Sequence, residues 1–431
     1  MTALLAFAPS ASALSEGGLR ARLGAALGPA GSASGAYVLD LSTRRSLWAR
    51  RPDRRLIPAS VNKLGTTATA LERYGPDGTI PTQVLGTGSL GDDGTYRGTL
   101  YLRGEGDPTF GSDSFTRSAY GGGGTTGDLA RQLDRLGVKK VRGRVLGDES
   151  FFDSRRGVPD SGYAPSIYIG PLSALDWNRG LGGGGFQNRP PVYAAARLID
   201  ALRAQGISVS GTPGAGTAPD GADQLAETES LPIGTIIRLT NHPSDNFLAE
   251  MLLKGLGARF GSAGSTAAGA AVVRAQLARW GARPTIVDGS GLGRGNRTTA
   301  RNVVRTLDGM ASSPNAKVFR DSLPVAGRSG TLAGRMNGTV AQDRCQAKTG
   351  TLSNVSALAG YCRTANGHTV AFAVIMDFVS VGGARSLQDR MAIALAASRP
   401  AGAAKRIATR PAPSATTPSA PATPGGGLTA P

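Results

Sequence analysis

The predicted helices and strands of this chain fall into two regular groups, separated by a block of different character. Long stretches of apolar periodicity predict helices and strands toward both ends of the chain. A block with only short apolar runs lies between them, so we expect one domain split by an insertion rather than independent domains in a row. The regular stretches are, in order, 14–27, 36–41, 46–49, a helix beginning near Ser60, 192–205, 247–256, 266–280, 299–310, 344–352, 355–363, 369–377 and 386–397.

The middle block predicts a mixed α/β inserted domain. It contains one helical stretch near 129–136. Its short apolar runs, broken by Gly, Asp and Thr, include 82–85, 98–102 and 141–146. We assign residues 77–187 to the insertion, and residues 14–76 and 188–400 to the domain that it splits.

The two ends of the chain differ from the rest. Residues 1–13 form a short apolar run ending in Ala11-Ser12-Ala13, a small-x-small pattern typical of a signal peptidase site. No basic residue precedes this run, so either the start codon lies further upstream or these residues are a frayed end. The leader interpretation predicts export to the cell wall or periplasm. Residues 401–431 are rich in Pro, Ala, Thr and Gly and lack acidic residues, which predicts a disordered tail.

Composition and charge exclude several classes of protein. No apolar run approaches the roughly 18–20 residues that cross a bilayer, so we expect a soluble protein without a transmembrane helix. The net charge is +18, but the basic residues are scattered, so no nucleic-acid partner is expected. His242 and His368 are the only histidines, and no cysteine–histidine cluster exists to hold zinc. The glycine runs 121–124 and 182–185 lack the ending of a phosphate loop. We expect neither a metal nor a cofactor.

The first motif with chemical meaning is Ser60-Val61-Asn62-Lys63, at the predicted start of a helix. Residues three apart share a helix face, which places the Lys63 amine beside the Ser60 hydroxyl. A partly desolvated lysine can be neutral enough to take the proton of a serine, and this makes the serine a nucleophile. The N–H of Ser60 in the first helical turn is suited to one half of an oxyanion hole.

Two further motifs follow in order. Ser244-Asp245-Asn246 precedes a predicted helix, and Lys348-Thr349-Gly350-Thr351 lies on a predicted hairpin strand. Each of the three motifs alone is weak evidence. Ser244-Asp245-Asn246, for example, is more often a helix cap than a catalytic group. Their order, on a helix start, a loop between helices and a strand, is what a serine acyltransferase of the penicillin-recognising kind requires.

On these motifs the chain resembles the D-alanyl-D-alanine carboxypeptidase/endopeptidase family of class C, low-molecular-mass penicillin-binding proteins. The resemblance covers nearly all of residues 36–378. It implies an α+β fold, in which an antiparallel sheet flanked by helices forms a penicillin-binding protein/β-lactamase-like domain with one inserted α/β domain. Supporting segments are 102–108, 147–153, 170–175, 287–292 and 323–332. Larger family members carry a second insertion, which is absent here because only the glycine-rich stretch 180–185 follows Leu175.

The resemblance also implies roles for the motif residues. Ser60 attacks the carbonyl of the penultimate D-alanine and Lys63 takes its proton. Ser244 relays a proton to the leaving amine, and Asn246 bonds the substrate amide or Lys63. The N–H groups of Ser60 and Thr351 form the oxyanion hole.

The remaining site residues are expected to bind the substrate. Lys348, with Thr349, Gly350 and Thr351, is expected to seat the terminal carboxylate. Arg294 either lines the substrate pocket or is a surface residue of an arginine-rich chain. The implied partners are peptidoglycan stem peptides and β-lactam antibiotics.

Two other functions compete with a D,D-peptidase. A serine β-lactamase shares all three motifs, but the Glu-x-x-Leu-Asn pattern of its class A deacylating base is missing between Ser60 and Ser244. The other is a non-catalytic protein that binds a polyanion of the cell wall through its net charge of +18. The basic run 43–55 is either a solvated hairpin or a segment attracted to the anionic wall. Carboxypeptidase and endopeptidase action are not separated by the sequence.

Cys345 and Cys362 are the only cysteines. If Ser353 and Asn354 form the turn of the predicted hairpin, counting outward places Cys345 opposite Cys362. We hypothesise a cross-strand disulfide. Two buried free thiols are the alternative, because a slip of one residue in register would break the pairing.

Overall fold

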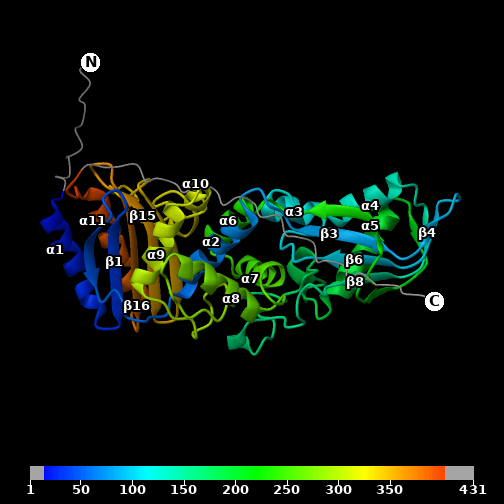
Figure 1. Cartoon of the computed structure of the whole chain (residues 1–431), viewed down its shortest axis with the longest axis horizontal. Helices are drawn as coiled ribbons and strands as arrows, with labels where there is room; N and C mark the ends of the chain where they lie inside the picture. Colours follow the sequence, from blue (N-terminus) through cyan, green and yellow to red (C-terminus); the bar gives the residue numbers. More distant parts are fainter. Residues whose placement is uncertain (1–13, 403–431) are drawn as a thin grey trace, which may run out of the picture.

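The computed structural model describes residues 14–402. The predicted leader, 1–13, and nearly all of the predicted tail, 401–431, lie outside the described residues. Figure 1 shows an elongated molecule with one large sheet toward each end and a group of helices between them. The predicted α+β class is confirmed.

The first sheet is antiparallel and is built from the two ends of the chain. Its strand order is β14-β15-β16-β1-β2. The central strands β15 and β16 are apolar and buried along almost their whole length, because helices cover both faces of this sheet. The strands are β1 (Ser34–Asp40), β2 (Arg45–Arg50), β14 (Cys345–Leu352), β15 (Val355–Arg363) and β16 (Thr369–Asp377).

Two helical layers enclose this sheet. On one face α1 (Glu16–Leu27) packs beside α11 (Val381–Ala397), and both bury leucine and alanine side chains against the strands. The other face is covered by a helical group that includes α2, the helix that follows Ser60 (Figure 1). The helices of this group are α2 (Lys63–Tyr74), α6 (Ile233–Asn241), α7 (Asn246–Phe260), α8 (Thr266–Arg279), α9 (Ala300–Ala311) and α10 (Ala316–Asp321).

The far end of the molecule holds two further sheets with a core of their own. One has the order β12-β8-β6-β3-β13 and the other β11-β7-β5-β4. The helices here are α3 (Asp113–Tyr120), α4 (Thr126–Arg135) and α5 (Pro190–Ala204). The strands are β3 (Pro81–Gly86), β4 (Ser89–Leu90), β5 (Thr95–Arg97), β6 (Leu100–Gly104), β7 (Lys140–Arg142), β8 (Val145–Asp148), β11 (Ser208–Val209), β12 (Pro213–Ala215) and β13 (Asp223–Glu229). The short hairpin β9 (Leu181–Gly182) and β10 (Gly185–Phe186) occupies the glycine-rich stretch.

Two sequence predictions differ from this arrangement. The run 141–146 is divided between β7 and β8, which belong to different sheets. Beyond the predicted end of the insertion at residue 187, α5 packs on β8 and β13 pairs with β3. We therefore propose that the insertion extends from about residue 77 to about residue 230 and that the split domain resumes there.

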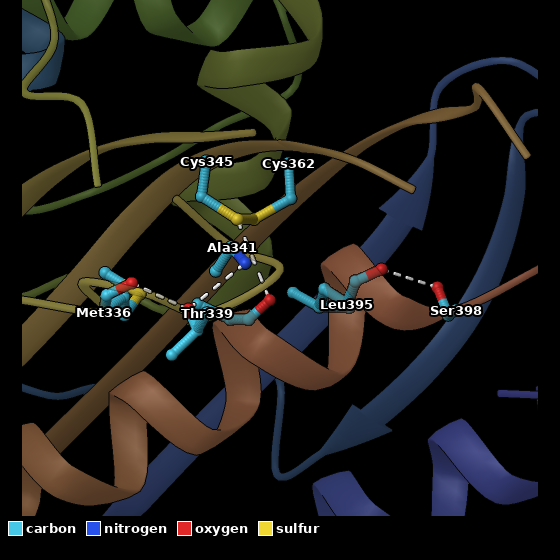
Figure 2. The surroundings of a disulfide bond; sticks show 8 residues. Met336, Thr339, Ala341, Cys345, Cys362, Leu395 and Ser398 are labelled. Atoms are coloured by element: carbon cyan, nitrogen blue, oxygen red, sulfur yellow. Dashed lines mark hydrogen bonds between the residues drawn. A yellow bond between two sulfur atoms is a disulfide. The ribbon is translucent and has the colours of Figure 1, made fainter. Parts of the chain in front are cut away.

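The hairpin of β14 and β15 has the predicted register, with Leu352 opposite Val355 and Cys345 opposite Cys362. The two cysteines are joined by a disulfide in the structure. Both are fully buried on the face of the sheet that α11 covers, near Leu395 (Figure 2). The bond therefore ties the strand of the third motif to its neighbour.

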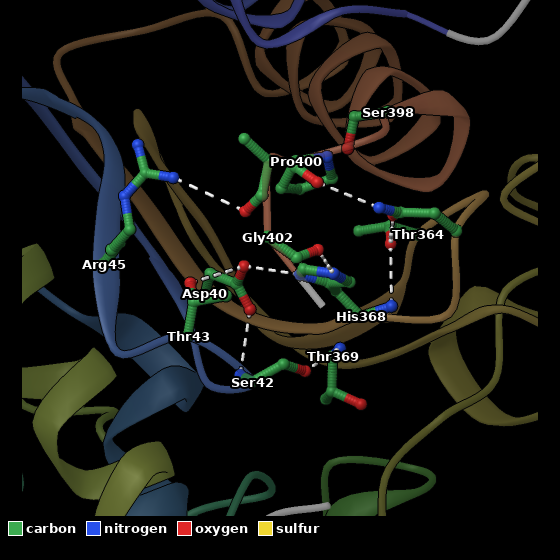
Figure 3. Close-up of polar contacts among 12 residues, drawn as sticks. Asp40, Ser42, Thr43, Arg45, Thr364, His368, Thr369, Ser398, Pro400 and Gly402 are labelled. Carbon is green, nitrogen blue, oxygen red and sulfur yellow. Dashed lines mark hydrogen bonds and ion pairs between the residues drawn. The ribbon is translucent and has the colours of Figure 1, made fainter. Parts of the chain in front are cut away.

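A buried polar cluster holds the end of the described chain against the first sheet. His368, in the turn before β16, lies between the Asp40 carboxylate, at 2.7 Å from Nδ1, and the Gly402 carbonyl, at 3.0 Å from Nε2 (Figure 3). Asp40 also accepts hydrogen bonds from the Ser42 N–H and the Thr43 hydroxyl. These contacts give His368 a structural place far from the three motifs.

Within residues 14–402, no helix is long and apolar enough to cross a membrane.

Candidate active site

Ser60 lies in a single 3-10 turn (Ala59–Asn62) that leads directly into α2. The α-helix itself begins at Lys63, three residues later than the sequence suggests. The predicted proximity is nevertheless present, because Lys63 Nζ lies 3.0 Å from Ser60 Oγ. Ala59, just before the serine, has a positive φ of 47°, which aims this turn at the first sheet at the cost of local strain.

The Lys63 amine is fully buried and has three hydrogen-bond acceptors. They are Ser60 Oγ, Asn246 Oδ1 at 2.7 Å and the Ser290 carbonyl at 2.7 Å. Burial lowers the pKa of Lys63 to about 8, against the opposing effect of nearby carboxylates. A lysine with this pKa is partly neutral near neutral pH and can accept a proton from the hydroxyl that it touches.

The second motif connects α6 to α7. Ser244 adopts a positive φ of 67°, and Asp245 caps α7 by accepting a hydrogen bond from the Leu248 N–H. Asn246 is the first residue of α7, and its amide joins Lys63 to the carbonyl of Tyr168, 3.2 Å from Nδ2. The cap therefore fixes the helix end that aims Asn246 at Lys63.

Arg179 supports this loop from outside the motif. Its guanidinium forms a bidentate ion pair with Asp245, at 2.7 and 3.1 Å, and stacks over the Phe247 ring. Arg179 itself adopts a positive φ of 59°. No local sequence pattern links position 179 to position 245, so Arg179 could not be identified as a site residue without the tertiary structure.

The third motif lies on the edge strand β14, directly against the turn that holds Ser60. A Cβ on Gly350 would lie 2.6 Å from the Pro58 carbonyl oxygen and 3.2 Å from the Ser60 nitrogen. Only a glycine permits this close approach of the strand to the nucleophile. Close packing against the turn of Ser60 is therefore the reason for glycine at position 350.

Lys348 is placed differently from the sequence expectation. Its side chain is fully buried, and its Nζ donates to the carbonyl of Thr349 at 2.9 Å. Burial, and then the charge of Lys63, lower its pKa well below the usual lysine value. The hydroxyl of Thr349 bonds that of Thr331 at 2.7 Å, and both threonines face the cleft.

A cleft of about 530 Å³ opens where the motifs meet. Ser60 and Ser244 line it together with residues of β14 and α11. The remaining lining residues are Thr331, Gly334, Arg335, Thr349, Thr351, Arg385, Ser386 and Asp389.

Two buried carboxylates outside the motifs organise the base. Glu250, one helical turn after Asn246, accepts hydrogen bonds from the N–H groups of Gly289 and Ser290, and so holds the loop whose carbonyl binds Lys63. Burial and the neighbouring Asp288 raise the pKa of Glu250 to about 7. Asp288 binds the N–H groups of Gly291 and Gly293. The sequence does not show that both carboxylates bind backbone N–H groups of the same loop, 289–293.

Arg294 lies outside the lining of this cleft. Its guanidinium binds the β14–β15 turn through the carbonyl and hydroxyl of Ser353 and the side chain of Asn354, and its N–H donates to Asp160. The structure thus gives Arg294 a role in holding the hairpin. No cluster of three or more metal-ligating side chains occurs among residues 14–402.

Comparison with known proteins places this geometry in a family. The model of the D-Ala-D-Ala carboxypeptidase 3 (S13) family matches residues 22–181 and 187–399. A D-alanyl-D-alanine carboxypeptidase of Actinomadura sp. is 32% identical over 451 aligned positions, which cover 85% of this chain and 81% of that protein. The crystal structure of penicillin binding protein 4 from Haemophilus influenzae superimposes with a TM-score of 0.72 at 20% identity, covering 86% of this chain and 97% of that one. The same protein complexed with a novel β-lactam gives a TM-score of 0.67 at 21% identity, covering 86% and 98%.

Proposed function

The chain belongs to the D-Ala-D-Ala carboxypeptidase 3 (S13) family of serine peptidases, and from this premise we propose that it hydrolyses D-alanyl-D-alanine bonds of peptidoglycan stem peptides through an acyl-enzyme on Ser60. The observation that carries the proposal is the contact of Lys63 Nζ with both Ser60 Oγ and Asn246 Oδ1. It joins a nucleophile, a base of lowered pKa and an orienting amide in one cleft.

The residues support a two-step reaction. Ser60 Oγ bonds to the carbonyl carbon of the penultimate D-alanine while Lys63 takes the hydroxyl proton, and the oxyanion forms toward the N–H groups of Ser60 and Thr351. The bond to the leaving amine then breaks, and Ser244 relays the proton held by Lys63 to that amine, which leaves Lys63 neutral. Lys63 next takes a proton from the water that attacks the ester and returns it to Ser60 Oγ as the shortened peptide leaves.

Two extensions belong to the same proposal. Penicillins acylate Ser60, as the binding of a β-lactam by the related Haemophilus influenzae protein suggests. Cross-links between D-alanine and a diamino acid are also cleaved, because the scissile bond and the carboxylate next to it resemble those of D-alanyl-D-alanine. These substrates place the protein outside the cytoplasm, consistent with a leader in residues 1–13.

The decisive experiment compares the wild type with Ser60→Ala. We expect the variant to release no D-alanine from a pentapeptide and to take no label from a fluorescent penicillin. Ser114→Ala, an exposed serine of α3, is the matched control and should retain both activities. A Ser60→Ala protein that still becomes labelled would refute the nucleophile. Rapid loss of the penicilloyl mass from the wild type would favour a β-lactamase instead.

A further inference from the structure

The third motif does not supply a free positive charge to the cleft. Lys348 is its only cation, but its amine is buried and bonded to the Thr349 carbonyl. Its lowered pKa also favours the neutral amine. Thr349 and Thr351 line the cleft, but their hydroxyls carry no charge, and the hydroxyl of Thr349 donates to Thr331 unless a ligand replaces that bond.

Arg385 of α11 brings a positive charge to the same cleft. It is an exposed residue of the first turns of α11, it lines the cleft with Ser60, and its Nη2 lies 3.4 Å from Thr351 Oγ1. Within the described chain no carboxylate lies within ion-pair distance of Arg385. The guanidinium is therefore available to a ligand that also reaches Thr351.

The other charges of the cleft neutralise each other. Arg335 binds the Asp389 carboxylate at 2.7 Å, so neither adds a net charge where a substrate would lie. Arg335 also donates to the Arg385 carbonyl at 3.1 Å, and the buried Gln388 donates to Ser356 of β15. The backbone of Arg385 is thereby fixed to the catalytic sheet while its guanidinium is free.

We propose that Arg385 is the residue that binds the α-carboxylate of the leaving amino acid, with the hydroxyls of Thr349 and Thr351 as its partners. The inference rests on the proposed peptidase function and defines its substrate class. That class is peptides whose leaving residue keeps a free α-carboxylate, either a terminal D-alanine or a diamino acid at a cross-link. Peptides in which this carboxyl is amidated are poor substrates, because an amide cannot form a charge-assisted pair with a guanidinium.

The test is the hydrolysis of two peptides by Arg385→Gln. One is an N-acylated L-lysyl-D-alanyl-D-alanine with a free carboxylate, and the other is its C-terminal carboxamide. We expect Arg385→Gln to lower kcat/KM for the acid by about tenfold to a hundredfold. The rate for the carboxamide should stay close to the wild-type value, so the preference for the acid collapses. Arg390→Gln makes the same charge change on the same helix outside the cleft and should keep the preference.

The outcomes separate this inference from the proposed function. An equal fall for both peptides, or no fall for either, would overturn the role of Arg385. If the wild type cleaves neither peptide, the peptidase proposal fails. The role of Arg385 is then decided by acylation rates with benzylpenicillin and its methyl ester, of which only the acid should slow in Arg385→Gln. A wild type that neither reagent acylates contradicts both proposals.

Discussion

Lys63 Nζ donates a 2.7 Å hydrogen bond to Asn246 Oδ1, across 183 residues of sequence that include the inserted sheets. The Lys63 amine therefore binds side chains of both the first and the second motif. Only when this amine is neutral can it take the proton of Ser60.

The acylation rate should rise with pH. Because the pKa of Lys63 is lowered to about 8, the amine is mostly protonated and inactive as a base at pH 7, and mostly neutral at pH 9. We expect the second-order rate constant for labelling by a fluorescent penicillin to increase through this window, with a midpoint near pH 8. A rate that is flat or falls between pH 7 and 9 would contradict Lys63 as the base.

Glu250→Gln should move this profile to lower pH. The Glu250 carboxylate raises the pKa of Lys63 against the effect of burial, so removing its charge leaves the neutral amine more favoured. The measurement is the midpoint of the same acylation profile. Glu72→Gln, on the helix that carries Lys63 but bonded to Ser313, is the control and should leave the midpoint in place. A shift to higher pH in Glu250→Gln would contradict the electrostatic explanation.

Much of the fold could be predicted from local pattern, and the failures have a common cause. The strands 355–363 and 369–377 were predicted with their observed bounds, because continuous apolar runs define them. The periodicity of 192–205 predicts helix α5 but not the domain to which it belongs, because this periodicity is the same whichever sheet the helix packs against. The helices α3 and α6 and the strand β13 were missed, since they are short or polar.

In the candidate active site, too, contacts within one helical turn can be predicted from the sequence, whereas contacts between distant segments cannot. Ser60 and Lys63 are three residues apart, so their contact follows from helix geometry alone. The contacts of Glu250 with the 287–293 loop and of Arg179 with Asp245 join distant segments, and no periodicity records them. The buried state of Lys348 likewise depends on tertiary packing, so the motif alone predicts a free ammonium, whereas its amine is bonded to the Thr349 carbonyl.

Arg179→Ala should weaken catalysis. The ion pair with Asp245 holds the loop of Ser244 and Asn246. We expect a loss of about 1–2 kcal/mol of stability, since one charge-assisted pair is removed, and an acylation rate about tenfold lower. Thermal unfolding and penicillin labelling measure the two effects. Arg197→Ala, which breaks an exposed pair with Asp200, should change neither. Unchanged acylation in Arg179→Ala would show that the loop is held without this pair.

The disulfide should stabilise the third motif. Cys345 and Cys362 close a loop with a separation of 17 residues, and a loop of this size contributes about 3 kcal/mol in the chain-entropy model. The double variant Cys345→Ala, Cys362→Ala should therefore unfold at lower denaturant concentration, with some acylation retained in the folded fraction. Alkylation of the unreduced, denatured wild type followed by intact mass measurement is the direct test. Two alkylated thiols there would establish the free-thiol alternative.

Gly350→Ala should separate the catalytic strand from the nucleophile. The new Cβ would lie 2.6 Å from the Pro58 carbonyl oxygen, so either β14 or the turn of Ser60 must move. Backbone atoms on both sides leave no flexible side chain to yield, and we expect a cost of about 1–3 kcal/mol in stability. Because the displacement falls between Ser60 and Thr351, acylation should fall by about a hundredfold or more. Gly382→Ala is the matched control, since its Cβ would meet nothing within 4 Å in α11 and alanine favours a helix. If Gly350→Ala were acylated as fast as Gly382→Ala, the close approach of the strand would have no part in forming the oxyanion hole.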